Sequence, residues 1–268
     1  MSGNTKTLKL RIKSVDSTLH LTKAMGLVAS SKMRKANLAM AAGRQYEQAL
    51  QNIVELLTSS PECDSSPFMR EFKDGGKTKL IVIAGDRGLA GGYNANVFRT
   101  VRDFGEADII AIGKRACERY DKENVSSEKF YATDAFKLAK QLCEEFKNGE
   151  FDRLGIVTTN YISMMTQAPD IKWVLPLVKG KNSKNASAVF EPDEITILEV
   201  AVLEYVSGMI ISCVRESFAS EVAARRMAMD SAGKNAQQMI DELMLEYNRA
   251  RQGAITQEIT EIVAGSGN

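Results

Sequence analysis

The first 45 or so residues place apolar or small side chains at alternating steps of three and four. An average step of 3.5 residues is typical of a coiled-coil seam, whereas a helix lying on a domain repeats at 3.6. Several seam residues are small, which lets two helix backbones approach closely. The predicted seam consists of Leu8, Ile12, Val15, Leu19, Thr22, Gly26, Ala29, Met33, Ala36, Met40 and Gly43.

A matching seam runs through the last part of the chain. Leucine is scarce on both seams, so the pair gains less hydrophobic stabilisation per turn than a leucine zipper, and we expect other protein to surround it. Because a long segment separates the seams, antiparallel pairing is the simplest arrangement. The second seam consists of Met229, Ala232, Ala236, Met239 and Leu243, continues through Tyr247, Ala250 and Ala254, and shifts at Ile255, Ile259 and Ile262.

The placement of proline extends both seams into long helices. All five prolines lie between Pro61 and Pro192, and proline is excluded from helix interiors because it lacks a backbone donor and clashes with the preceding turn. We therefore predict helices over residues 1–60 and 193–268, with an α/β domain over 77–192. Such helices extend for roughly 80 to 110 Å.

The middle of the chain alternates short apolar runs with helical sequence. Apolar strands alternating with helices indicate a parallel or mixed sheet with helices on its faces. The predicted fold class is therefore α/β, with a long antiparallel coiled coil of the two terminal helices. We expect strands over 79–84, 108–112, 153–159 and 173–178, helices over 95–104 and 132–147, and a loop over 182–192.

The overall charge of +1 conceals a difference between the two ends. Residues 1–60 hold nine basic and three acidic residues, and residues 193–268 hold six basic and twelve acidic ones. The net charges of +6 and −6 favour pairing between the ends, although single charges are more often only solvated. No run of 18 apolar residues predicts a membrane span. The four scattered cysteines are expected to be reduced thiols of a cytoplasmic protein.

A glycine-rich turn, GDRGLAGGYN at residues 85–94, follows the first predicted strand, where a phosphate binds in dinucleotide folds. The turn does not match GxGxxG. Residues 76–78 resemble the tail of a P-loop, but a strand follows them instead of a helix. We expect the glycines to allow a tight turn, with Asp86, Arg87 and Gly88 as structural residues and Asp86 with Arg87 as a polar lock.

The sequence shows no catalytic constellation. The only histidine, His20, has no cysteine or paired carboxylate near it in sequence, and no HExxH, GxSxG or Cys/His spacing is present. We therefore expect no catalytic residue, no cofactor and no metal site.

Both ends and the central turn carry a resemblance to one family. Residues 11–36, RIKSVDSTLHLTKAMGLVASSKMRKA, and 249–265, RARQGAITQEITEIVAG, resemble the two ends of the gamma subunit of F-type ATP synthases. The Asp-Arg-Gly-Leu stretch of the turn is similar to that family's central motif, and residues 220–236 are similar to its penultimate helix. The resemblance implies a curved antiparallel coiled coil with a Rossmann-like α/β domain beside it.

The resemblance also implies a function and partners. Such a subunit is the non-catalytic central rotor shaft that couples ion flow through the membrane ring to conformational cycling of the catalytic beta subunits. The implied partners are the alpha and beta subunits of the hexamer, the epsilon subunit and the c-subunit ring, with no nucleic acid and with peripheral membrane association. We expect the cytoplasmic face of a bacterial plasma membrane, because no organelle transit peptide is visible.

Particular contact residues follow from the same resemblance. Lys23 and Met25 are expected to face the residues of the upper shaft from the other helix, or to face a beta-subunit loop. Glu204 and Tyr205 are expected to contact the c ring at the foot. Coupling contacts near the upper shaft are expected from Arg251, Gln252, Thr256, Glu258 and Glu261. Alternatively, Gln252 and Thr256 satisfy each other across the coil.

Two other classes of protein fit parts of this sequence. One is a nucleotide-binding α/β protein with helical arms for dimerisation, which predicts nucleotide affinity for the isolated chain. The other is a basic coiled coil that binds nucleic acid through residues 9–44. The acidic partner helix is expected to mask much of that positive field, on which phosphate binding depends.

Overall fold

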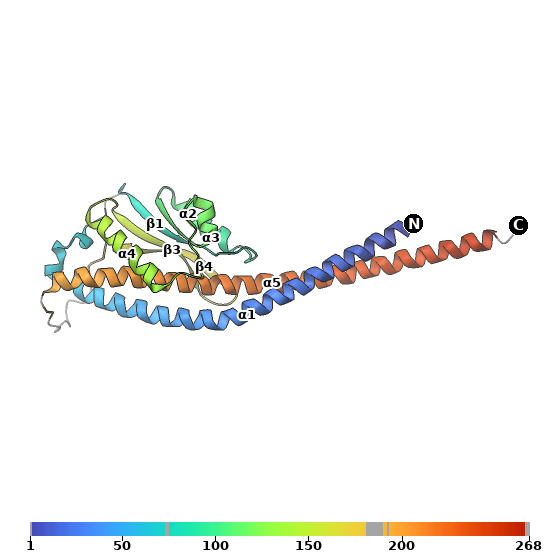
Figure 1. The fold of residues 1–268 in the computed structure, drawn as a ribbon, viewed down its shortest axis with the longest axis horizontal. Helices are drawn as coiled ribbons and strands as arrows, with labels where there is room; N and C mark the ends of the chain where they lie inside the picture. Colours follow the sequence, from blue (N-terminus) through green and yellow to red (C-terminus); the bar gives the residue numbers. More distant parts are fainter. Residues whose placement is uncertain (1, 73–74, 181–189, 192, 266–268) are drawn as a thin grey trace. The chain divides into compact units, whose positions relative to one another are not determined.

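The computed structural model describes residues 2–72, 75–180, 190–191 and 193–265, with side chains from residue 5 onward. The chain divides into two compact units, Met1–Ser30 with Arg225–Asn268, and Ser31–Ala224. The helices α1 to α5 and the strands β1, β3 and β4 are labelled in Figure 1. In chain order the elements are α1 (Ser2–Thr58), η1 (Pro61–Ser65), η2 (Pro67–Met69), β1 (Thr78–Ile83), α2 (Tyr93–Phe104), β2 (Asp108–Ile112), α3 (Lys114–Tyr120), α4 (Ala132–Lys147), β3 (Arg153–Tyr161), β4 (Gln167–Leu175) and α5 (Glu194–Gly265).

The first unit consists of the beginning of α1 and the end of α5, which run antiparallel. Gly26 faces Met229, because a Cβ at position 26 would lie 3.7 Å from the Cβ of Met229. Leu19 packs with Ala236 and Ile240. A lower number on α1 therefore meets a higher number on α5, and the predicted antiparallel pairing is confirmed.

The predicted seam on α1 is buried or half-buried at every position from Leu8 to Gly43. Four seam positions predicted on α5 are wrong, because Met239 and the shifted stripe of Ile255, Ile259 and Ile262 are all exposed. Met239 is 43% exposed, whereas Ile240 is 6% exposed. The reason is that the steps of four and three on α5 follow a different register, through Met229, Gly233, Ala236, Ile240, Leu243, Tyr247, Ala250 and Ala254.

The second unit contains a four-stranded mixed sheet in the order β2-β1-β3-β4 (Figure 1). β1 pairs in parallel with β2 and with β3, and β3 pairs antiparallel with β4. The predicted α/β class is confirmed. β4 begins well before the predicted 173–178, because Pro169 reads as a strand breaker yet is tolerated on an edge strand. The short helix α3 was not predicted, and most of the predicted loop at 182–192 lies outside the described residues.

Both faces of the sheet are covered by helices. Leu80 and Val82 of β1 point to one face and pack with α2 and α3, which contribute Val97, Val101 and Ala116. Ile81 and Ile83 point to the other face and pack with α4 and α5. This two-sided cover explains why β1 is a continuous apolar run.

In the second unit, α1 and α5 remain antiparallel, and α5 is mostly buried from Leu198 to Ala223. Gly208 allows a close approach, since a Cβ there would lie 2.2 Å from the Cδ1 of Leu50. One 18-residue window of α5 is apolar enough to cross a membrane by length and composition, yet 67% of it is buried within the structure. Such burial is typical of the core helix of a globular protein.

An arginine lies against aromatic rings in the sheet. The guanidinium carbon of Arg153 on β3 is 3.3 Å from the ring centroid of Trp173 on β4 and 5.0 Å from that of Phe72. Gly155 makes room for the indole, because a Cβ there would lie 2.8 Å from Trp173 Cζ3. Burial lowers the pKa of Arg153. Trp173 is the only tryptophan of the chain.

Candidate functional site

The turn after β1 is held together by the carboxylate of Asp86. This carboxylate accepts hydrogen bonds from the backbone N–H groups of Lys114 at 3.1 Å, Ser127 at 2.9 Å and Glu128 at 3.1 Å. It also accepts one from the hydroxyl of Ser126. Burial by itself would raise the pKa of Asp86, but the four hydrogen bonds outweigh it and lower the pKa below its usual range. Asp86 therefore joins the end of β1 to the start of α3 and to the loop that follows it.

The arrangement around Asp86 bears on the nucleotide-binding alternative. In open α/β sheets, ligands bind at the carboxyl ends of the strands, with an anion against backbone N–H groups. Here the carboxylate of Asp86 already accepts hydrogen bonds from backbone N–H groups at this end of the sheet. Gly85 also packs against Glu221 of α5, because a Cβ there would lie 2.7 Å from the carboxyl carbon. Asp86 is therefore a structural residue of this turn, in which Gly88 also lies and the Arg87 carbonyl accepts a hydrogen bond from Asn94. The expected pairing of Asp86 with Arg87 stays a prediction.

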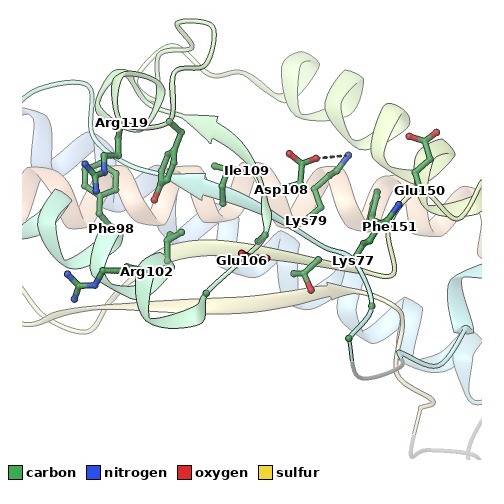
Figure 2. Close-up of a pocket in the computed structure, with 17 residues that line it drawn as sticks. Lys77, Lys79, Phe98, Arg102, Glu106, Asp108, Ile109, Arg119, Glu150 and Phe151 are labelled. Atoms are coloured by element: carbon green, nitrogen blue, oxygen red, sulfur yellow. Dashed lines mark ion pairs between the residues drawn. The ribbon is translucent and has the colours of Figure 1, made fainter.

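A large open pocket lies at the opposite, amino end of the parallel strands. Its volume is about 1100 Å³, and it is lined by residues 75–79, 105–109 and others (Figure 2). Figure 2 shows Lys79 joined to Asp108, at 3.4 Å, and Lys79 also pairs with Glu145 at 2.7 Å. Because its lining mixes cations with carboxylates, at the end of the sheet where α/β folds do not bind nucleotides, this pocket does not support the nucleotide-binding alternative.

Groups with reactive side chains are not assembled into a catalytic site in the part of the chain that the structure describes. The side chain of His20 is 75% exposed, and its Nε2 lies 3.7 Å from Asp16. Burial raises the pKa of both Cys143 and Cys213 to about 12, so these thiols are poor nucleophiles. Among the described residues, no cluster of three or more His, Cys, Asp or Glu side chains is suited to hold a metal ion.

The predicted coupling residues at the end of α5 lie on an exposed stretch of helix. All five of them are exposed: Arg251, Gln252, Thr256, Glu258 and Glu261. The Thr256 hydroxyl donates to the backbone carbonyl of Gln252 at 2.9 Å, on the same helix. The idea that Gln252 and Thr256 satisfy each other across the coil is therefore wrong, because both belong to α5. Their contact with other subunits stays a prediction.

Lys23 and Met25 lie at a different level of the first unit. Lys23 lines a groove with Arg226, Asp230 and Gly233. Since Gly26 faces Met229, the antiparallel register places Lys23 and Met25 far from residues 251–261. The expectation that they face those residues from the other helix is wrong, and only the expected contact with a beta-subunit loop remains as a prediction.

Glu204 and Tyr205 differ in accessibility. Glu204 is exposed and accepts a hydrogen bond from the Tyr46 hydroxyl at 3.4 Å. Tyr205 is 8% exposed and belongs to the main core cluster, where burial raises its pKa to about 12. The side chain of Tyr205 is therefore a packing residue, and Glu204 is the accessible member of the predicted foot contact.

A cluster of four charges, three of them largely buried and the fourth, Arg44, 46% exposed, was not predicted from the sequence. Lys172 of β4 lies 3.0 Å from Glu47 of α1 and 3.4 Å from Glu216 of α5. Arg44 of α1 pairs with Glu216 as well, so one ion pair joins the basic helix to the acidic one. A signal was present in the sequence, because Glu47 continues the seam by a step of four from Gly43. An acidic residue on a seam indicates a buried partner of opposite charge.

The fold class is α/β, with a mixed four-stranded sheet covered by helices on both faces and with long N- and C-terminal helices that run antiparallel. Solved structures share this fold. A chain of the cryo-EM structure of the Euglena gracilis mitochondrial ATP synthase rotor superposes with a TM-score of 0.68 at 18% identity, covering 95% of this chain and 100% of that chain. A chain of another structure of that ATP synthase, titled OSCP/F1/c-ring, gives a TM-score of 0.71 at 17% identity, covering 99% and 94%.

Sequence comparison gives the family. The sequence profile of the family described as ATP synthase matches residues 4–267. The ATP synthase gamma chain of Ruminococcus albus is 41% identical, over 99% of both chains. That of Mycoplasma mobile is 36% identical, over 97% of this chain and 96% of the relative. The chain belongs to the ATP synthase gamma chain family.

Proposed function

We propose that this chain is the central rotor shaft of an F-type ATP synthase. In that role it couples ion flow through the membrane ring to conformational cycling of the catalytic beta subunits, during ATP synthesis or hydrolysis. The observation that carries the proposal is similarity to an ATP synthase gamma chain along 99% of both chains. The helices of 57 and 72 residues support it, because a shaft needs long uninterrupted helices to carry torque.

The shaft itself makes and breaks no covalent bond. It biases a catalytic site only through the difference between its contacts with the open and the closed state of that site. The energy comes from ions that cross the membrane, at roughly 2.3 kcal/mol per charge for each 100 mV. Three or four charges at about 150 mV therefore supply roughly 10 to 14 kcal/mol for the release of a tightly held product.

The proposed partners are the alpha and beta subunits around the helix pair, and the epsilon subunit and c ring at the foot. Large apolar side chains on the first unit support an enclosing partner, since Leu21, Leu27 and Val28 are 59%, 69% and 58% exposed. Exposed apolar patches of this kind mark interaction surfaces. We place the complex at the cytoplasmic face of a bacterial plasma membrane, to which the chain is attached peripherally through its partners.

Within this complex, the proposed contacts to the alpha and beta subunits are Lys23, Met25, Arg251, Gln252, Thr256, Glu258 and Glu261, and the proposed foot contact is Glu204. To test the first group, Arg251→Ala with Glu258→Ala is introduced into the assembled ATPase. We expect lower ATP-driven ion pumping at unchanged assembly. The matched control is Glu242→Ala, an exposed carboxylate on the paired part of α5. An equal effect of the control would contradict the assignment.

The role as a whole is tested by affinity purification of the tagged chain under native conditions. We expect ATPase alpha and beta subunits to be recovered in stoichiometric amounts, with ATP hydrolysis that depends on the chain. Calorimetry of the isolated chain with ATP distinguishes the nucleotide-binding alternative. Measurable ATP binding by the chain alone, together with an absence of ATPase subunits, would overturn the proposal.

A further inference from the structure

The contact between α5 and the sheet is polar over one short stretch. β3 pairs with β1 only as far as Val157, so the edge of β3 beyond this point lacks a strand partner on that side. Side chains of α5 take the place of the missing strand. Ser217 Oγ accepts the N–H of Thr159 at 3.2 Å, and Glu216 accepts the N–H of Tyr161 at 3.1 Å.

The same stretch of β3 is held through further hydrogen bonds. Ser220 donates its hydroxyl to the carbonyl oxygen of Thr159 at 3.0 Å. The Thr158 hydroxyl lies 2.9 Å from that of Ser217, and the Tyr93 hydroxyl donates to the Ser217 carbonyl at 3.0 Å. Hydrogen bonds depend on direction as well as distance. This contact therefore fixes the sheet at one angle and one height on α5, which an apolar surface does not do.

The buried charge cluster extends this polar contact to α1. Lys172 Nζ lies between the carboxylates of Glu47 and Glu216, and the side chains of these three residues are 23%, 11% and 4% exposed. Glu47 also accepts the hydroxyl of Ser212 at 2.6 Å. One lysine of the sheet thus pairs with both helices. Arg44, whose side chain is 46% exposed, completes a neutral set of two cations and two carboxylates at the solvent-facing side of the cluster.

The pKa values of two members reflect their charged neighbours. Burial alone would lower the pKa of Lys172, but Cys213, Glu47 and Glu216 beside it raise the pKa above its usual range. Burial would also raise the pKa of Glu216, yet Arg44, Lys172 and the Tyr161 N–H lower it.

Buried ion pairs contribute little net stability, since well-packed apolar residues of similar volume often serve as well or better. A set of four charges in this contact is therefore poorly explained by stability alone. Directional contacts between α1, β4 and α5 are explained if the sheet must keep a constant angle to the two helices. We propose that Arg44, Glu47, Lys172 and Glu216 form a torsional joint that fixes the α/β domain to both helices, with Lys172 as its positioning residue.

The proposed rotor role underlies this inference. When torque passes between the membrane ring and the catalytic hexamer, a loose joint lets the α/β domain turn against the helix pair. Part of the rotation is then lost as elastic twist.

The test uses the assembled ATPase with a bead attached to the α/β domain at an introduced cysteine, Lys122→Cys, which is an exposed position. The angular fluctuation of the bead is recorded in the nucleotide-locked complex, for the otherwise unchanged chain and for Lys172→Met. We expect the variance to rise by roughly two-fold, because both ion pairs of Lys172 are lost. Amide exchange at Thr159 and Tyr161 is expected to be roughly ten-fold faster, as in local opening.

The matched control is Lys79→Met. Lys79 is also a largely buried lysine with two carboxylate partners, but both of them, Asp108 and Glu145, belong to the α/β domain. We expect its variance to equal that of the unchanged chain. An increase as large as that of Lys172→Met would overturn the proposal, because loss of any buried lysine would then loosen the domain.

A second variant separates positioning from stability. The combination Glu47→Gln, Lys172→Met and Glu216→Gln removes three charges with little change of shape. We expect it to fold and assemble, with the same increase in variance as Lys172→Met. Arg44 keeps its charge in this triple variant, and its side chain is 46% exposed to solvent. A fluctuation equal to that of the unchanged chain, or failure of the triple variant to fold, would overturn the proposal. If the bead on the unchanged chain does not turn during ATP hydrolysis, the rotor role itself fails, whatever the variants show.

Discussion

The two long helices are supported differently in the two units of the molecule. In the second unit, α5 is mostly buried from Leu198 to Ala223, between α1 and the sheet. In the described part of the first unit, α1 and α5 pack against each other along a narrow seam, in which Leu19, Ala236 and Ile240 form a small buried cluster. The same secondary structure is therefore part of a core in one unit and a nearly bare pair in the other.

This difference indicates which unit is stabilised by apolar contacts within the chain and which depends on contacts with partner proteins. The second unit buries apolar area of its own, and side chains of its α5 hydrogen-bond the backbone of β3. The first unit leaves large apolar side chains in solvent, including Leu27 at 69% and Ile262 at 70% exposure. A helix pair with so little burial of its own gains stability from surrounding protein. In the proposed rotor role, partner subunits enclose the first unit, whereas the second unit has a core of its own.

The largest expected change in the free energy of unfolding comes from a comparison of one core substitution in each unit. Ile210→Ala removes a fully buried side chain from the main core, and we expect the free energy of unfolding to fall by about 2 to 5 kcal/mol. Leu19→Ala removes a side chain from the small buried cluster between α1 and α5. We expect it to increase only the local opening of the first unit. Urea denaturation measures the global effect, and amide exchange measures the local one. An equal decrease in the free energy of global unfolding for the two variants would contradict the conclusion that the two units are supported differently.

A smaller effect concerns the polar lock of the second unit. Asp86→Asn removes a charge that accepts three backbone hydrogen bonds and places an amide donor against N–H groups, so we expect a loss of about 2 kcal/mol at neutral pH. The pKa of Asp86 is lowered in the folded chain. Its contribution is therefore complete above the unfolded pKa of about 3.9 and is lost as the pH falls through the folded pKa.

The difference between Asp86→Asn and the unchanged chain should therefore shrink in acid, as measured by thermal unfolding across pH. The control is Asp103→Asn, an exposed carboxylate whose side chain is 61% exposed. We expect it to change the unfolding temperature little at any pH. A difference between Asp86→Asn and the unchanged chain that is constant down to the lowest pH would show that the Asp86 charge is not what stabilises the turn.

The smallest expected effect is an increase in helix stability in the first unit. Gly253 lies inside α5, and a Cβ there would meet nothing within 4 Å. Gly253→Ala is therefore expected to stabilise the helix locally by about 1 kcal/mol through helix propensity alone. Circular dichroism should show increased helicity. Gly208→Ala provides the contrast, because its Cβ would lie 2.2 Å from Leu50 and should cancel that gain.

Much of this fold could be predicted from local pattern. The proline-free ends predicted both helices, and α4 has the predicted bounds of 132 and 147. The edge strand β4 was placed too late, because its half-exposed face and Pro169 hide the apolar pattern that marks a buried strand. Local signals are strong where one element buries a regular face, and weak at the edge of a sheet.

The buried charges were harder to predict than the helices, for a physical reason. Lys172 is separated in sequence from Glu47 by 125 residues and from Glu216 by 44. No local pattern reports a pairing over that distance. The contacts predicted at Arg251 and Glu258 differ again, because both side chains are exposed in the single chain and the contacts stay predictions. They rest on the family resemblance.

The indole of Trp173 offers a natural optical probe of the edge strand. Its ring lies against the Arg153 guanidinium and beside Phe104, whose centroid is 5.7 Å away. No second tryptophan contributes to the emission of the chain. Any departure of β4 from β3 should therefore alter the intensity and wavelength of fluorescence, which reports on the seating of the sheet without any added dye.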